Sequence, residues 1–287
     1  MTTPPTRAIG PVGLVIVGVL SVQLGAAIGK SLFDEISPTT VVWLRLATSA
    51  VVLLLWARPS VRGRTWAQWW PVLALGVVLG AMNWSIYQSF ERIPLGIAIT
   101  IELAGPLTLA MLTSRRAADL VWIGLAAVGV VLLGFEPGDL TVAGVLFAVV
   151  AGGLWAAYIL LTARIGRAWS GVDGLAVASA VALVCLTPVL AGGGHLGDLG
   201  TTRIWIIGAA VGLLSSVVPY SAEMIALRSL SPVVFGVLVS LDPAAAALAA
   251  LAVIGESLSA LQWLAIACVV AASVGMTRSG HETLVDG

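Results

Sequence analysis

Long apolar stretches, separated by short polar or charged breaks, run through almost the whole chain. A helix that crosses a bilayer of about 30 Å needs about 20 apolar residues, and ten stretches have roughly that length. Their predicted cores are residues 11–29, 38–57, 70–90, 95–113, 120–135, 141–162, 171–191, 204–227, 233–254 and 258–277. Their runs do not alternate between polar and apolar residues as a membrane β-strand does. The pattern therefore predicts an all-α membrane protein with ten transmembrane helices.

Composition agrees with this assignment. Hydrophobic residues make up 59% of the 287 residues and charged residues only 10%, whereas a soluble chain is about a quarter charged. The 14 basic and 14 acidic residues balance, so no basic surface for nucleic acid is expected and the lipid bilayer is the expected environment. Cys185 and Cys268 lack metal-ligand spacing, and we expect neither a disulfide framework nor a bound metal.

The basic residues predict the orientation, because cytoplasmic loops retain Lys and Arg. With ten spans and a cytoplasmic N-terminus, the cytoplasmic segments would carry Arg7, Arg58, Arg62, Arg64, Arg115, Arg116, Arg164, Arg167, Arg228 and Arg278. The opposite side would carry only Lys30, Arg92 and Arg203. Both termini are therefore predicted to be cytoplasmic.

The chain also shows a weak internal repeat. The end of the first span, GAAIGK, is echoed by ILLTAR at the end of the sixth, and a helix expected to break at Pro106 is echoed by one broken at Pro243. Two repeats of five helices, residues 1–137 and 138–287, would have opposite orientations, as in many secondary transporters. Chance similarity between two hydrophobic halves remains the alternative.

Charged residues inside the spans are the first candidates for function. A charge in hydrocarbon costs at least about 2.5 kcal/mol on insertion scales, and Arg45, Glu102, Glu223 and Asp242 all lie inside predicted spans. Arg45 and Glu102 lie at similar depth and are expected to meet. Arg45 neutralises only one carboxylate, so the others are candidates to bind a proton or a substrate ammonium group. Ion pairs that only stabilise the bundle are the alternative for each residue.

Polar and aromatic residues at helical spacing are the candidates for a cavity lining. Asn83 and Tyr87 are four residues apart in the third span, Trp155 and Tyr158 share a face of the sixth, and Tyr220 precedes Glu223 by three. Ordinary packing is the alternative reading of each aromatic residue.

Enzyme and channel signatures are absent from the sequence. It contains no HExxH, GxGD or GxSG motif and no repeated filter sequence, and LGAAIGKS, which resembles a phosphate loop, lies in a membrane span. We therefore expect no catalytic residue and no cofactor, and a secondary carrier remains. A membrane subunit that transports nothing is the alternative from another class.

Several motifs together resemble a known family. They are GKSLF, SPTTVVWLRLA, NWSIYQSFERIPLGIAITIELAGPL, GGLWAAYILLTARIG, VPYSAEMIALRSL, LVSLDPA and IGESLS. This combination resembles the EamA-type branch of the drug/metabolite transporter superfamily, and within it the bacterial threonine/homoserine exporters of the inner membrane.

The resemblance implies an inner-membrane carrier that expels small neutral amino acids in exchange for protons. It leaves open a homodimer, and also export of a drug or another metabolite on the same fold. Carried over position by position, it implies polar roles for Lys30, Arg45, Glu102, Glu223, Asp242 and Glu256.

Overall fold

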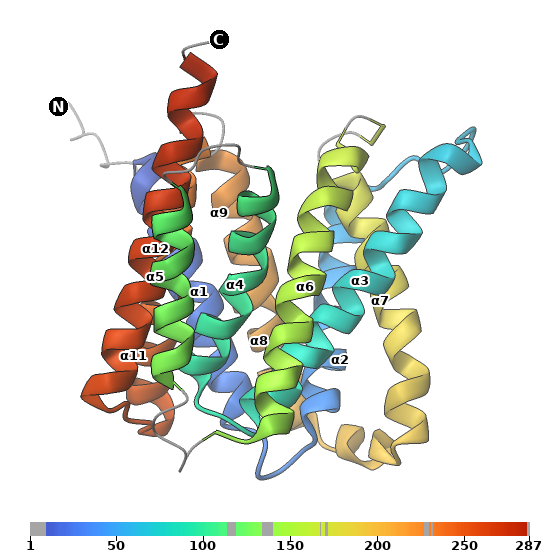
Figure 1. The fold of residues 1–287 in the computed structure, drawn as a ribbon. Helices are drawn as coiled ribbons and strands as arrows, with labels where there is room; N and C mark the ends of the chain where they lie inside the picture. Colours follow the sequence, from blue (N-terminus) through green and yellow to red (C-terminus); the bar gives the residue numbers. More distant parts are fainter. Residues whose placement is uncertain are drawn as a thin grey trace, which may run out of the picture.

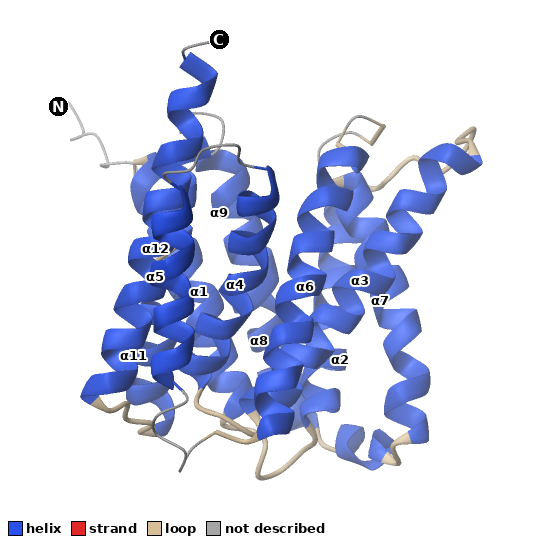
Figure 2. Ribbon diagram, in the orientation of Figure 1, coloured by secondary structure: helices blue, strands red, loops and turns tan. Residues whose placement is uncertain are grey.

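The computed structural model describes residues 10–113, 119–133, 140–166, 168–169, 172–226, 230 and 232–285. These residues form helices and loops and include no strand (Figure 2), which confirms the all-α prediction. The elements are α1 (Pro11–Lys30), α2 (Pro38–Ala57), α3 (Trp66–Phe90), α4 (Leu95–Thr113), α5 (Asp119–Leu133), α6 (Val142–Ile165), α7 (Asp173–Gly192), η1 (His195–Gly200), α8 (Thr202–Gly212), η2 (Leu213–Val217), α9 (Val218–Ala226), α10 (Pro232–Val239), α11 (Asp242–Ile254) and α12 (Ala260–Val285).

Six helical segments in these ranges are long and apolar enough to cross a membrane: α1, α2, α3, α6, α7 and Val237–Ile254. Shorter apolar segments, Leu95–Leu109, Thr202–Val217 and Ala260–Gly275, lie within three more of the predicted spans. Large apolar side chains such as Leu55 and Val142 are exposed on the outside of the bundle, as expected of a surface that faces lipid. The chain is a multi-pass membrane protein.

Local capping explains where several helices begin. The Ser37 hydroxyl accepts a hydrogen bond from the Thr40 amide at 3.1 Å and starts α2 just before a proline. The Thr65 amide donates to Gln68 Oε1 at 3.0 Å at the start of α3, and Thr141 caps α6 in the same way as Ser37 caps α2. These bonds satisfy amide groups that the first turn leaves unpaired.

The predicted eighth and ninth spans are not regular helices. The eighth contains a wide π turn, η2, between α8 and α9. The ninth is divided into α10 and α11 at Ser240 and Leu241, directly before Pro243, which has no amide hydrogen to continue the helix. Irregular backbone inside a membrane is tolerated only where protein or a water-filled cavity surrounds it.

Pro106 does not break its helix, contrary to the expectation from the sequence, because α4 runs through it from Leu95 to Thr113. Proline leaves the carbonyl of residue i−4 without its helical hydrogen bond. That carbonyl, of Glu102, faces α6, where a Cβ placed on Gly152 would lie 2.6 Å from it. α4 and α6 therefore pack backbone to backbone at this point, and α4 continues through Pro106 as a helix.

The helices pack into one bundle (Figure 1). α6 contacts α3 and α4, α7 contacts α2 and α3, α1 contacts α9 and α11, and α5 contacts α12. α1 begins and α12 ends at the same end of the bundle, here named the terminal face (Figure 1). The opposite end, where α1 ends at Lys30 and α4 begins at Leu95, is named the clasp face.

Candidate functional site

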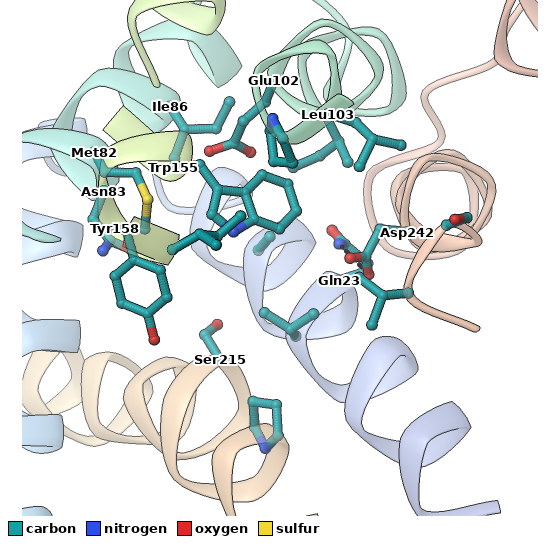
Figure 3. A pocket seen from close by; sticks show the side chains of 18 of the residues that line it. Gln23, Met82, Asn83, Ile86, Glu102, Leu103, Trp155, Tyr158, Ser215 and Asp242 are labelled. Carbon is teal, nitrogen blue, oxygen red and sulfur yellow. Dashed lines mark hydrogen bonds between the residues drawn. The ribbon is translucent and has the colours of Figure 1, made fainter. Parts of the chain in front are cut away.

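A cavity of about 480 Å³ lies inside the bundle, between α1, α3, α4, α6, η2 and the α10–α11 break. This volume is within the range of small-molecule sites. Its polar lining comprises Gln23, Arg45, Asn83, Glu102, Trp155, Tyr158, Ser215, Ser240, Asp242 and Ser273. Figure 3 shows Glu102 and Asp242 on different sides of this space, with Asn83 and Tyr158 opposite Asp242.

Arg45 of α2 lies in the cavity wall and is 9% exposed. Its Nη2 donates to the Ser215 carbonyl at 3.0 Å, its Nε donates to the Ser216 hydroxyl at 3.4 Å, and its Cζ lies 5.7 Å from the centre of the Tyr87 ring. Nη1 makes no hydrogen bond within the described part of the chain. The guanidinium group is therefore held in place while keeping donors for an anion.

The π turn η2 supplies the acceptor for Arg45. In this turn the Val218 amide bonds to the carbonyl of Leu213, five residues earlier, so the turn is wider than an α-helical one. Two of its carbonyls accept bonds from other helices: Leu214 from the Ser21 hydroxyl at 2.7 Å, and Ser215 from Arg45. The wide turn thus ties α1 and α2 to the middle of the predicted eighth span.

The expected pair between Arg45 and Glu102 is not present: among the described side chains Glu102 forms neither an ion pair nor a hydrogen bond. Arg45 instead bonds to η2, an acceptor that a sequence pattern does not reveal. Glu102 is 7% exposed and lines the cavity. Its carboxylate is available to a ligand cation or a proton.

Asp242 begins α11 at the helix break and is 8% exposed. Gln23 Nε2 donates to Asp242 Oδ1 at 3.1 Å, and this bond joins α1 to α11. Gln23 was not among the residues predicted from the sequence. The signal was present, because an amide side chain within a predicted apolar span is costly unless it has a partner.

The structure places Asn83, Trp155 and Tyr158 in the cavity lining. Tyr87, one turn beyond Asn83 on α3, is fully buried and lies outside the lining, packed on Phe33 and Phe90. The Arg45 guanidinium lies over its ring, so Tyr87 contacts a side chain that lines the cavity without lining the cavity itself.

Two further predicted residues are not described in full. Glu223 and Tyr220 lie on α9, and their side chains are outside the described part of the structure.

Lys30, predicted to line the cavity, lies one turn beyond it at the clasp face. Its Nζ bonds to Glu256 Oε1 at 2.7 Å and to the Ile93 carbonyl at 3.0 Å. Glu256 Oε2 accepts a hydrogen bond from the Leu95 amide, the first of α4, at 2.8 Å. Lys30, Ile93, Leu95 and Glu256, here named the clasp, join the end of α1, the start of α4 and the α11–α12 loop. Phe90, near the end of α3, is buried and lines the cavity.

Comparison with known proteins identifies the family. The model of the EamA-like transporter family matches residues 142–278. The threonine/homoserine exporters RhtA of Salmonella typhimurium LT2 and of Escherichia coli K12 are both 38% identical over 271 residues, which cover 93% of this chain and 91% of each exporter.

A solved crystal structure of another protein, 17% identical, aligns with 94% of this chain and 98% of its own with a TM-score of 0.65. At this identity the likeness concerns the fold alone. The identity to the exporters over nearly the full length carries the assignment: the chain belongs to the EamA-like transporter family.

Proposed function

We propose that this protein exports small neutral amino acids of the threonine and homoserine type. The observation that carries the proposal is the cavity, in which one arginine and two carboxylates face a common space without forming ion pairs with one another. A zwitterion supplies the complementary charges. The identity to exporters of threonine and homoserine over 93% of the chain supports the same substrate class.

In this proposal Arg45 binds the substrate carboxylate. Its planar fork suits a carboxylate, and its contacts with η2 and Tyr87 fix its orientation before substrate arrives. Glu102 and Asp242 attract the ammonium group from α4 and α11. Asp242 already has one neutral donor, Gln23, so Glu102 is the less satisfied carboxylate.

The imbalance of charge in the cavity supports proton antiport as part of this proposal. One arginine faces two buried carboxylates, and an uncompensated buried charge is costly. A proton relieves that cost when the substrate is absent, and the ammonium group relieves it when the substrate is bound. Competition between the two at one site is the requirement for exchange.

The proposal includes ten spans in two inverted repeats, residues 1–137 and 138–287. In such a repeat, α1 is equivalent to α6, α3 to α8–α9, and α4 to α10–α11. The helix contacts agree with this equivalence: α6 packs on α3 and α4, and α1 packs on their equivalents, α8–α9 and α10–α11. Equivalent helices of the two halves also contact each other directly, in the pairs α2–α7, α4–α11 and α5–α12. α1 runs away from the terminal face and α6 runs towards it (Figure 1), as opposite orientations require.

The terminal face is assigned to the cytoplasm of a bacterial inner membrane. Arg58, Arg64 and Arg164 lie at or beside helix ends on this face, whereas Lys30 and Arg203 lie at the other (Figure 1). This distribution follows the tendency of cytoplasmic loops to hold basic residues. The clasp then closes the cavity towards the outside.

Reconstituted liposomes test the proposal. Protein-containing and empty liposomes are preloaded with labelled threonine, and efflux is followed with and without a pH gradient and an ionophore. Gradient-dependent efflux inhibited by unlabelled homoserine is the expected result. Efflux at the same rate with and without the gradient would show that transport is not coupled to protons. Inhibition of threonine efflux by unrelated solutes and not by homoserine would favour an exporter of drugs or other metabolites. Absence of any transport by folded protein would support a non-transporting subunit.

Variants of the carboxylates test their assignment. Glu102→Gln and Asp242→Asn keep the size of each side chain and remove its charge. We expect both to reduce efflux and to flatten its dependence on pH. Unchanged efflux and pH dependence in both variants would show that neither carboxylate takes part.

A further inference from the structure

Asn83 has one polar atom that the fold does not use. The side chain lies on α3 in the cavity wall beside Met82 and Ile86 (Figure 3), and it is 4% exposed. Its Nδ2 donates to the Leu79 carbonyl, one turn earlier, at 2.8 Å. A carbonyl accepts only from the NH₂ end of the amide, so this bond fixes which way the amide is turned. Oδ1 has no hydrogen-bond partner in the described part of the chain.

The chemistry of this free atom limits what it can bind. Amide oxygen is a neutral acceptor, so it neither attracts a carboxylate nor matches Glu102 or Asp242 as a partner for an ammonium group. A hydroxyl group is a neutral donor and suits it. A polar side chain left half-paired inside a membrane span is costly, and a substrate hydroxyl would complete its hydrogen bonds.

Asn83 and Arg45 line the same cavity. The Arg45 guanidinium lies over the ring of Tyr87, which follows Asn83 by four residues on the same face of α3, about 6 Å along the helix axis. Arg45 and Asn83 both line the cavity, so an amino acid with its carboxylate at Arg45 would occupy the space that Asn83 borders. Threonine carries its hydroxyl on the β-carbon and homoserine on the γ-carbon.

We propose that Asn83 Oδ1 accepts a hydrogen bond from the side-chain hydroxyl of the substrate, so that the cavity selects hydroxylated amino acids over apolar ones of the same size. The inference rests on the proposed function and adds a residue that sets specificity. Apolar walls alone discriminate poorly between isosteres, whereas a site built around a hydroxyl rejects the analogue that leaves its acceptor unpaired.

Valine is the informative competitor, because it has the shape of threonine with a methyl group in place of the hydroxyl. In liposomes containing the wild-type protein, we expect unlabelled valine to inhibit labelled threonine transport at least about tenfold more weakly than unlabelled threonine does. In Asn83→Leu, which has no acceptor, we expect threonine and valine to inhibit within about twofold of each other. Threonine itself should bind more weakly to this variant.

The control is Ser85→Ala. Ser85 lies two residues further along α3 and is buried, but it does not line the cavity. This variant should keep the wild-type preference for threonine. A wild-type preference in Asn83→Leu would overturn the inference, since the selectivity would then arise elsewhere.

The two proposals fail in different ways. If the wild-type protein does not transport threonine, the proposed function is wrong. If it transports threonine and valine inhibits equally well, export stands and the role of Asn83 is wrong. This second comparison needs no variant, so it decides the question even if Asn83→Leu does not fold.

Discussion

Removing Glu256 should open the clasp face of the cavity. Its two carboxylate oxygens bind Lys30 at the end of α1 and the first amide of α4, and Glu256→Ala removes both contacts. A hydrogen bond to a charged group contributes about 1.5–3 kcal/mol and a helix cap about 1 kcal/mol. The Lys30 and Glu256 side chains are 15% and 20% exposed, so water screens part of this attraction. We expect a loss of about 2 kcal/mol, or about a 30-fold shift from closed towards open.

Distances between spin labels measure this shift directly. Cysteines replace Ser31 and Ser257, which are exposed at the clasp face, after Cys185 and Cys268 have been substituted. Pulsed electron resonance on wild-type protein should give one short distance. Glu256→Ala should add a longer distance that accounts for much of the signal, and Glu256→Gln, which keeps an acceptor oxygen, should fall between them.

The pair of Glu35 with Arg203 at the same face provides the control. Both side chains are largely exposed, and exposed pairs contribute little, so Glu35→Ala should leave the distances almost unchanged. Identical distance distributions in the wild type and in Glu256→Ala would refute the reasoning, because the clasp would then not keep the ends of α1 and α11 together at this face.

Further predictions concern the site and the stability of the bundle. Arg45→Lys keeps the charge but loses the planar fork, so the threonine concentration that gives half-maximal efflux should rise about tenfold with little change in maximal flux. An unchanged concentration would show that Arg45 supports the structure and does not bind the substrate. Gly105→Ala would drive a Cβ into the Gly152 carbonyl and should lower the free energy of unfolding by about 1–3 kcal/mol, whereas Gly124→Ala, with open space around it, should not; equal melting temperatures would contradict this. Partial burial raises the pKa of Asp198, but hydrogen bonds from Thr40 and Ser37 and the nearby His195 outweigh it and hold the pKa below its ordinary value. Its stabilising effect should therefore be complete at neutral pH and be lost as pH falls below about 3.9, so Asp198→Asn should lower the melting temperature at neutral pH and not in strong acid.

Hydrophobic pattern predicted most of the fold but not its irregular turns. The starts of α1, α2 and α4 agree with the predicted spans, because membrane helices are selected by length and apolarity alone. Pro243 was correctly placed at a helix break, whereas Pro106 lies within α4, which packs closely on Gly152 of α6 at this point. The sequence shows a proline, but it does not show what packs against it.

The cavity was predicted in part. Charged residues in apolar spans led to Arg45, Glu102 and Asp242, all of which line it. The depth of a residue along its helix, however, does not determine which neighbouring helix its side chain faces. Arg45 was expected to pair with Glu102 because the two lie at similar depth, but it bonds to η2 instead. Lys30 has a partner 226 residues away in the sequence, and no local pattern could place that contact.

The π turn η2 has a consequence for how this chain tolerates insertions and deletions. A π turn holds one residue more than an α-helical turn, so deleting one residue of 213–217 would leave a regular helix in which α8 and α9 still face their neighbours. α8 packs mainly on α2 and α9 on α1, and a deletion within regular α8 would instead rotate the rest of the span by about 100° relative to these contacts. A single-residue deletion should therefore be far more damaging in α8 than in η2, where the chain loses only the wide turn and the acceptors that it offers to Ser21 and Arg45.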